Sequence, residues 1–335
     1  MDSTEKMLRT KFRLDVNNIA STFVQLFQLC HKQEISNLSD PLLRWLDFRL
    51  RFIDPRPRKL LFSKKFPKLL PKNIDRAAKN LFRKIEAGID INPYQGKGLI
   101  LHHDTSGNKR EHRTDLLWAD WNIVHFHLCD KEIPKNRYFS ERSDWLLFGM
   151  VGYDFLVCID IRHHKDNNLF NDPELVKIVA QSWPQIMSQY ELKGVHGLEA
   201  DLTAEEYAKV RKGGVACPVA IDGKVYIGPG MGVTTASTAT RVTSAEIDVL
   251  RYVDFLAKAI CDPSTQCLPG YQKTSGHEQI LSLCITPNGL AIHDDSLNMA
   301  WVLPKMDNTS EPDYLYILHN LLAPEWCVKK AFPEP

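Results

Sequence analysis

The sequence contains no run of about 18 apolar residues, which is the length a helix needs to cross a lipid bilayer. Residues 1–15 also lack the apolar core and the small-residue cleavage site of a secretory signal. We therefore expect a cytoplasmic protein with no membrane partner. The 335 residues exceed the usual size of one compact core, and hydrophobic and charged residues, at 44% and 25%, occur as often as in ordinary folded proteins.

The eight cysteines include no C-x-x-C pair, and this absence argues against a zinc ribbon or finger. Most of them lie in apolar runs, as Cys158 and Cys284 do, which is typical of buried reduced thiols. Cys129 follows His127 by two residues and is a candidate nucleophile that nothing else in the sequence favours. The sequence also has no G-x-S-x-G elbow, no kinase signature and no H-E-x-x-H motif.

A glycine-rich segment at residues 228–232 precedes Thr234, Thr235 and Ser237. Glycine amides can bind a phosphate, but this segment has neither the G-K-[ST] of a Walker A motif nor a G-x-G-x-x-G that opens a helix. We therefore interpret it as a mobile connecting loop and predict no bound cofactor.

Hydrophobic periodicity changes along the chain from the 3.6-residue period of helices to the two-residue period of strands. The four prolines of residues 55–72 predict an extended connector between the early helices. The predicted helices span residues 14–34, 41–53, 74–87, 173–187, 203–212 and 244–260. The predicted strands span residues 123–128, 145–151, 155–161, 215–221, 224–227, 280–286 and 290–293.

These elements predict a mixed α+β fold. It has a helical, basic N-terminal arm, a central antiparallel sheet with packed helices, and a C-terminal α+β portion. We place the domains at residues 1–90, 91–193 and 194–335, because Gly194 and Gly197 interrupt the pattern at the second boundary.

Positive charge is concentrated in one segment, although the net charge of the chain is only +1. Residues 41–84 contain 14 Lys and Arg residues against three acidic ones. Such an excess favours a polyanionic partner, and interleaved aromatic residues can either stack on unpaired bases or belong to the core. The candidate nucleic-acid-binding residues are Arg44, Arg49, Arg51, Arg56, Arg58, Lys59, Lys64 and Lys65.

Two histidines share one face of the strand predicted at residues 123–128, because side chains alternate along a strand. Imidazole is the side chain best suited to proton transfer near neutral pH. Polar residues of the following strands can join the pair if these strands are neighbours. The candidate catalytic residues are His125, His127, Arg142, Asp160 and His163. The alternative is that the histidines are half-buried structural side chains, or metal ligands.

The run DLLWADWNIVHFHL, followed by RSDWLLFGMV, FLVCIDIRHH and NDPELVKIVAQSWPQIM, is similar to uncharacterised bacterial and phage proteins with a D-W-x-I-x-H-x-H-L pattern. The resemblance continues through LTAEEYAKVRKGG and DGKVYIGPGMG and covers residues 75–260. It implies no particular activity.

The order of helix, antiparallel strands, and basic and histidine residues also resembles the RelE/ParE-type toxins, which are small metal-independent ribonucleases. In that class, basic and histidine or tyrosine side chains help a 2′-hydroxyl attack the adjacent phosphate. The resemblance implies such roles for Arg142, His125, His127 and His163. This chain is much longer than those toxins and has no single diagnostic motif.

A third resemblance concerns the cupins, whose first metal-binding motif is similar to H-x-H-x(4)-E at His125, His127 and Glu132. Their second motif resembles the segment that contains Pro287, Gly289, His293 and Asn298. The chain departs from the first motif at Ala119 and Phe139, where glycines are expected, and the spacings of the second motif are each one residue too long.

The leading hypothesis is a nucleic-acid-directed protein, specifically a metal-independent ribonuclease that acts on RNA in phage defence or toxin-type conflict. One alternative is a non-enzymatic adaptor or subunit of a defence complex that docks an acidic protein partner through the basic segment. Another is a metal-dependent enzyme of cupin type.

Overall fold

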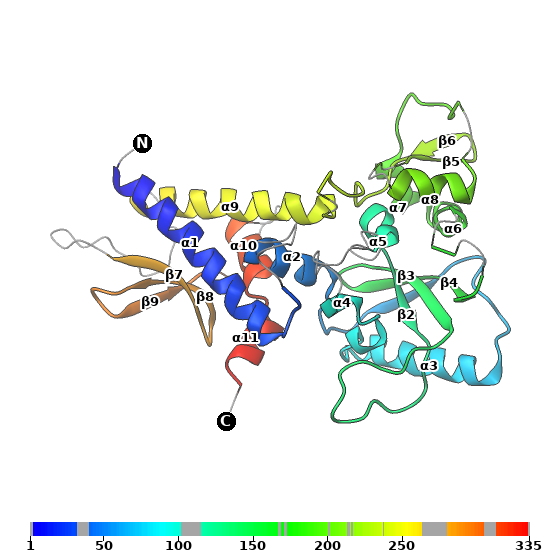
Figure 1. Ribbon diagram of the computed structural model, residues 1–335, viewed down its shortest axis with the longest axis horizontal. Coiled ribbons are helices and arrows are strands. Elements are labelled where there is room, and N and C mark those ends of the chain that lie inside the picture. The colour runs from blue at the N-terminus through cyan, green and yellow to red at the C-terminus, as the bar shows by residue number, and fades with distance from the viewer. Residues whose placement is uncertain are drawn as a thin grey trace. The chain divides into compact units, whose positions relative to one another are not determined.

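The computed structural model describes residues 3–31, 40–101, 115–166, 169–170, 173–199, 202–212, 215, 217–236, 238–262, 280–304 and 313–333. The fold is of mixed α+β class, as predicted (Figure 1). The chain divides into two compact units, a discontinuous unit of Met1–Leu50 with Val242–Pro335 and a continuous unit of Arg51–Arg241. The predicted domain boundaries near residues 90 and 193 both fall inside the continuous unit. No helix among the described residues is long and apolar enough to cross a membrane.

The discontinuous unit is built from both ends of the sequence. It contains α1 (Ser3–Leu26), α2 (Pro41–Arg51) up to Leu50, α9 (Thr240–Cys261) from Val242, β7 (Leu281–Thr286), β8 (Gly289–Asp294), β9 (Met299–Val302), α10 (Tyr314–Leu322) and α11 (Glu325–Ala331). The three strands form an antiparallel sheet in the order β7-β8-β9, and α1 packs against β7. Trp45 of α2 is fully buried and contacts Phe23 of α1 and Trp326 of α11. The N-terminal helices therefore share one core with C-terminal elements.

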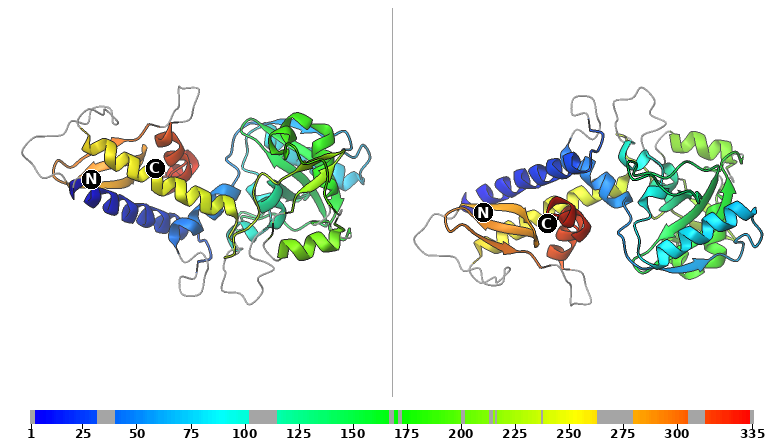
Figure 2. Two further views of the ribbon diagram at one scale, coloured as in Figure 1. Left: turned by 90° about the horizontal axis from the view of Figure 1, so that it is seen from above. Right: turned by 90° about the horizontal axis from the view of Figure 1, so that it is seen from below.

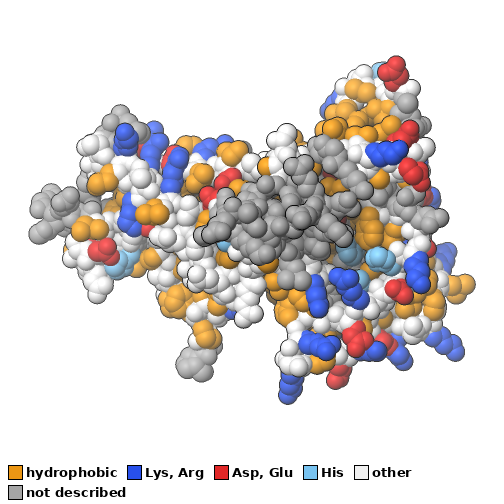
Figure 3. Space-filling model, in the orientation of Figure 1, with side chains coloured by type: hydrophobic (Ala, Val, Ile, Leu, Met, Phe, Trp, Pro, Cys, Tyr) orange, Lys and Arg blue, Asp and Glu red, His pale blue; other side chains and the backbone are white. Residues whose placement is uncertain are grey.

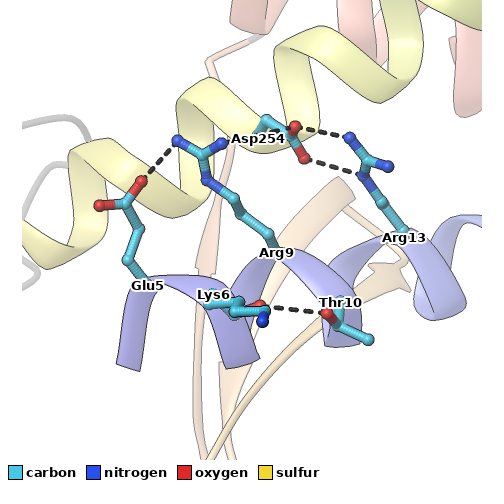
Figure 4. Close-up of polar contacts among 6 residues, drawn as sticks. All are labelled: Glu5, Lys6, Arg9, Thr10, Arg13 and Asp254. Atoms are coloured by element: carbon cyan, nitrogen blue, oxygen red, sulfur yellow. Dashed lines mark hydrogen bonds and ion pairs between the residues drawn. The ribbon is translucent and has the colours of Figure 1, made fainter. Parts of the chain in front are cut away.

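A carboxylate on α9 connects that helix to α1 (Figure 4). Arg13 donates to Asp254 from Nε at 2.9 Å and from Nη2 at 2.6 Å, which is a bidentate arrangement. Arg9 lies 3.7 Å from the same carboxylate and also pairs with Glu5 one turn earlier. These ion pairs join two segments that are more than 200 positions apart in the sequence.

The continuous unit is organised around a four-stranded sheet in the order β1-β4-β3-β2. The strands are β1 (Lys59–Phe62), β2 (Ile123–His127), β3 (Trp145–Val151) and β4 (Phe155–His163). The central antiparallel sheet is confirmed for β2, β3 and β4, whereas β1 pairs with β4 in parallel. Residues 59–62 lie between the prolines of the predicted connector, and only pairing with the distant β4 makes them a strand.

Helices cover both faces of this sheet (Figure 1). α3 (Lys72–Glu86) buries the stripe of Ile74, Ala77, Ala78, Leu81 and Ile85, as its period predicts, and contacts β1. On the other face, α5 (Leu116–Trp121) contacts β2 and α6 (Glu174–Ser182) contacts β4. The remaining elements of the unit are η1 (Asn92–Tyr94), α4 (Gly98–Leu101), α7 (Pro184–Met187), η3 (Ser188–Tyr190), α8 (Ala204–Lys212), β5 (Val219–Ile221) and β6 (Lys224–Tyr226).

Local signals in the sequence explain several boundaries. Trp183, just before Pro184, separates α6 from α7, because a proline disrupts a continuous helix. Asp222 and Gly223 have positive φ angles of 50° and 76° and join β5 to β6 in the predicted hairpin. Figure 2 shows the elements of each unit from above and from below the view of Figure 1.

Candidate active site

β2 is an edge strand, because among the described strands it pairs with β3 alone. Its alternation places His125 and His127 on the same face, and their ring centroids lie 6.1 Å apart. His125 also contacts the rings of Phe148 on β3 and Phe170 after β4. The two imidazoles therefore lie side by side at a sheet edge, against aromatic rings.

A cavity of about 640 Å³ opens beside this edge, within the usual range for ligand sites. The polar side chains that line it include Arg51, Asp115, His125, His127, Arg142 and His164. Over this unit, histidine side chains reach the surface next to Lys or Arg side chains (Figure 3). Three imidazoles, two guanidinium groups and two carboxylates, those of Asp115 and Asp144, thus line one space.

His127 is held by the backbone of Ser143. Its Nδ1 lies 2.9 Å from the Ser143 carbonyl oxygen and 3.3 Å from the Ser143 amide nitrogen. The shorter contact favours the tautomer with hydrogen on Nδ1, which leaves the lone pair on Nε2. Burial lowers the pKa of His127, the Ser143 hydrogen bond opposes this, and the charges of His125 and Arg142 lower the pKa further. A neutral imidazole of this kind can accept a proton near neutral pH.

Asp115 links the start of α5 to His125. Its Oδ1 accepts hydrogen bonds from the amides of Leu117 and Trp118, which makes it the N-cap of the helix. Its Oδ2 lies 3.5 Å from His125 Nδ1. Burial alone raises the pKa of the Asp115 carboxyl, but the contact with His125 and the amide of Trp118 outweigh burial and hold the pKa below its ordinary value. An anionic carboxylate is therefore available to a protonated His125.

The two arginines at the cavity have different surroundings. Arg142 is exposed, and its guanidinium makes no hydrogen bond or ion pair with the described residues. Arg51 is buried and donates to the carbonyl oxygens of Gly98 at 2.9 Å and Leu99 at 3.3 Å. Arg142 is therefore the guanidinium better placed to bind an anionic ligand, while Arg51 holds a wall of the cavity.

Two of the five predicted catalytic residues do not line the cavity. Asp160 accepts a hydrogen bond from Arg162 Nε at 2.7 Å. His163 lies with its ring edge-on to Trp145, at a centroid distance of 5.3 Å, and its Nδ1 accepts the amide of Lys165. The sequence pattern predicts that this strand ends at residue 161, whereas β4 continues to His163. The residue that follows the strand and lines the cavity is therefore His164 and not His163.

Asp115 and His164 were not among the predicted site residues. An aspartate before the apolar run LLWADW is a helix-cap signal, and this signal could have identified Asp115 as an ordered side chain. His164 had no comparable signal, because its position depends on where β4 ends.

The glycine-rich segment at residues 228–232, which the sequence predicts to be a mobile connecting loop, is packed against α5. Gly230 donates to Asp120 O at 2.9 Å and Gly232 donates to Ala119 O at 3.1 Å. A Cβ atom on Gly228 or Gly230 would lie 2.2 Å or 1.9 Å from these same backbone oxygens. The glycines therefore permit a close backbone contact that fixes α5, and with it Asp115 at the cavity.

Four of the eight predicted nucleic-acid-binding residues, Arg44, Arg49, Arg51 and Arg58, donate hydrogen bonds to backbone carbonyl oxygens of the protein. Arg44, Arg51 and Arg58 are buried. Arg44 and Arg49 donate to the carbonyl oxygens of Cys30 and Asn320 inside the discontinuous unit. The sequence could not predict this, because the carbonyl groups that bind these guanidinium groups come from other parts of the chain.

Arg58 lies in the continuous unit, where its Nε donates to Gly152 O at 3.0 Å. The other four candidates belong to the same unit. Arg56 lies over the ring of Tyr153, 4.0 Å from its centroid. Lys59, Lys64 and Lys65 are exposed, and Lys65 pairs with Glu174 at 2.9 Å. Only this later part of the basic segment presents its charge at the surface.

The two segments that resemble the cupin motifs lie in different units. His125 and His127 lie in the sheet of the continuous unit, whereas Gly289 and His293 lie on β8 of the discontinuous unit, so the two motifs do not share one barrel. Among the described residues, no group of three or more His, Cys, Asp or Glu side chains could hold a metal ion. Cys129 does not line the cavity.

Comparisons with known proteins bring no further identification. A scan against protein-family models, a search of curated proteins and a search of solved structures each find no match to this chain.

Proposed function

We propose that the cavity beside β2 cleaves single-stranded RNA by general acid–base catalysis without a metal ion. The observation that carries this proposal is the convergence of His125, His127 and Arg142 on one cavity of about 640 Å³. Two imidazoles in different electrostatic surroundings can serve as the base and the acid of one reaction.

The chemistry follows from the surroundings of each group. Nε2 of neutral His127 takes the proton of a ribose 2′-hydroxyl, and the oxygen attacks the adjacent phosphorus. The bond from phosphorus to the 5′-oxygen breaks as protonated His125, paired with Asp115, gives its proton to that oxygen. Arg142 binds the phosphate and balances the charge that develops on its oxygens. The products are a 2′,3′-cyclic phosphate and a 5′-hydroxyl.

The direct test incubates the protein with short unstructured RNA of mixed sequence in the presence of EDTA, and then identifies the ends of the fragments. We expect 2′,3′-cyclic phosphate ends, and no cleavage where the 2′-hydroxyl is replaced by hydrogen. His127→Gln and His125→Gln should each lower the rate by about 10²–10⁴-fold. His163→Gln is the matched control, because His163 lies on β4 outside the cavity.

Intact RNA under all conditions would overturn the proposal, and so would an equal loss of activity in His127→Gln and His163→Gln. A role in phage defence or toxin-type conflict adds a cellular prediction. Expression of the wild-type chain should slow bacterial growth, and expression of His127→Gln should not.

A further inference from the structure

Exposed cations gather on the part of the continuous unit that contains β1 and α3. We call this surface the lysine face. It comprises Lys59, Lys64, Lys65, Lys68, Lys72, Arg76, Lys79 and Arg83, all of which are exposed. Residues 59–86 contain only two acidic residues, Asp75 and Glu86.

Most of the lysine face is not neutralised by the protein. Lys65, Arg76 and Lys79 form ion pairs with Glu174, Asp130 and Asp75, respectively. The other five cations make no ion pair with the described residues. They are Lys59, Lys64, Lys68, Lys72 and Arg83. Such an excess attracts a polyanion.

The cations of α3 form a regular stripe. Lys72, Arg76, Lys79 and Arg83 recur at intervals of four, three and four residues, so they follow the side of the helix opposite its buried stripe. At about 1.5 Å per residue this stripe is roughly 16 Å long, which is enough for several phosphates of an extended strand.

An exposed aromatic ring accompanies these charges. Phe62 at the end of β1 is 46% exposed, and its ring contacts Phe66 at 4.9 Å and Phe82 at 5.2 Å. The two supporting rings fix the position of Phe62 while almost half of its surface remains open. A fixed and open aromatic ring among cations is what unpaired bases stack upon.

We propose that the lysine face binds a stretch of single-stranded RNA separate from the stretch in the cavity. The choice of RNA as the polyanion rests on the proposed function. β1 and β2 are opposite edges of the sheet, separated by three strand spacings, or roughly 14 Å at about 4.8 Å each. A long strand can occupy both sites, whereas a dinucleotide in the cavity is too short to reach the lysine face.

The test measures binding of a fluorescent 20-nucleotide unstructured RNA to the full chain at several salt concentrations. The variant Lys59→Glu/Lys68→Glu/Arg83→Glu should bind at least about tenfold more weakly. The slope of its log binding constant against log salt concentration should be smaller in magnitude by about 2. The control Lys6→Glu/Lys209→Glu/Lys258→Glu changes the net charge equally at exposed lysines elsewhere and should bind nearly as the wild type does.

Stacking is tested separately from charge. Phe62→Leu should weaken binding by at least about fivefold, and Phe62→Trp should restore it, since a tryptophan ring also stacks. Cleavage of a dinucleotide by the triple charge variant should proceed at the wild-type rate, because the short substrate does not reach the lysine face.

Equal affinity of the wild type and the triple charge variant for the 20-nucleotide RNA would overturn the inference. Displacement of the RNA by a poly-glutamate peptide at lower concentration than by unlabelled RNA would overturn it in favour of an acidic protein partner. Binding that depends on the lysine face without any RNA cleavage would support the inference and remove the proposed catalytic function, so the two can fail separately.

Discussion

The two histidines of β2 are two positions apart, and their different neighbours suit the opposite roles that we propose for them. Burial lowers the pKa of His127 and, together with the charge of Arg142, outweighs the hydrogen bond to the Ser143 carbonyl oxygen, so this imidazole favours the neutral form. His125 lies beside the carboxylate of Asp115, and the contact with His125 and the amide of Trp118 outweigh burial and hold the pKa of that carboxyl below its ordinary value. The proposed division into base and acid therefore rests on backbone groups and side chains outside the strand.

The lowered pKa of His127 predicts a pH-dependent stability. The unfolded chain binds a proton at this histidine near pH 6.5, whereas the folded chain resists protonation to lower pH. The contribution of His127 to the free energy of unfolding is therefore present above about pH 6.5 and is lost as the pH falls through the folded-state pKa of this histidine. We expect the free energy of unfolding of His127→Gln to change less than that of the wild type between about pH 7 and 5, in denaturant titrations. Parallel curves for the two proteins would contradict the prediction.

Asp115 offers a way to separate charge from helix capping. Asp115→Asn keeps an N-cap acceptor for α5 but removes the negative charge beside His125, so the free energy of unfolding should change little. The proposed RNA cleavage should become slower by about tenfold or more, because the variant lacks the negative charge beside His125. Asp115→Ala should in addition cost about 1 kcal/mol of stability. A wild-type cleavage rate in Asp115→Asn would show that Asp115 only caps the helix.

At the scale of elements, the cavity depends on how α5 is held. This helix has only six residues, too few to be stable alone, and residues 228–232 contact its last turn through backbone hydrogen bonds. Asp120 of the same helix pairs with the buried Arg211 of α8. A short helix can carry a site residue because distant segments fix it.

Gly230→Ala tests this packing. The added Cβ would lie 1.9 Å from Ala119 O, a backbone atom that cannot rotate away, so α5 and the glycine segment must separate. We expect a loss of about 1–3 kcal/mol in the free energy of unfolding, together with weaker activity at the cavity. Gly197→Ala is the control, since no atom lies within 4 Å of a Cβ there. Equal stabilities of the two variants would refute the tight contact.

At the scale of the whole molecule, two compact units share one chain, and the discontinuous unit encloses the continuous one in sequence. Asp15 of α1 is buried in the discontinuous unit and accepts the amide of Leu283 on β7 at 2.9 Å. This bond joins an N-terminal helix to a C-terminal sheet, so the unit needs both ends of the chain. The candidate active site lies entirely in the continuous unit.

This division predicts that a substitution that destabilises one unit leaves the stability of the other unit unchanged. Asp15→Ala leaves the Leu283 amide without its partner, which should cost about 1–3 kcal/mol. Hydrogen exchange should accelerate in α1 and β7, while β2, β3 and β4 keep their protection and the proposed RNA cleavage keeps its rate. Equal acceleration in both units would instead indicate a single cooperative structure.

The sequence alone determined the features that depend on local periodicity. Alternation predicted β2, β3 and the shared face of His125 and His127, and the 3.6-residue period predicted the buried stripe of α3. Of the five predicted catalytic residues, these two histidines and Arg142 line the cavity. The strand β1, the strand β9 and the helices α10 and α11 had no such signal, because they are short and depend on distant partners.

Tertiary structure alone decided which charged side chains are exposed to solvent and which are buried. Arg44 and Lys59 look alike in the sequence, yet one is fully buried against a backbone carbonyl and the other is exposed. Likewise, the end of β4 places His164 at the cavity and turns His163 onto Trp145. The reason is physical: periodicity reports which way a side chain points from its own element, whereas its exposure and partners depend on segments that only the folded chain brings near.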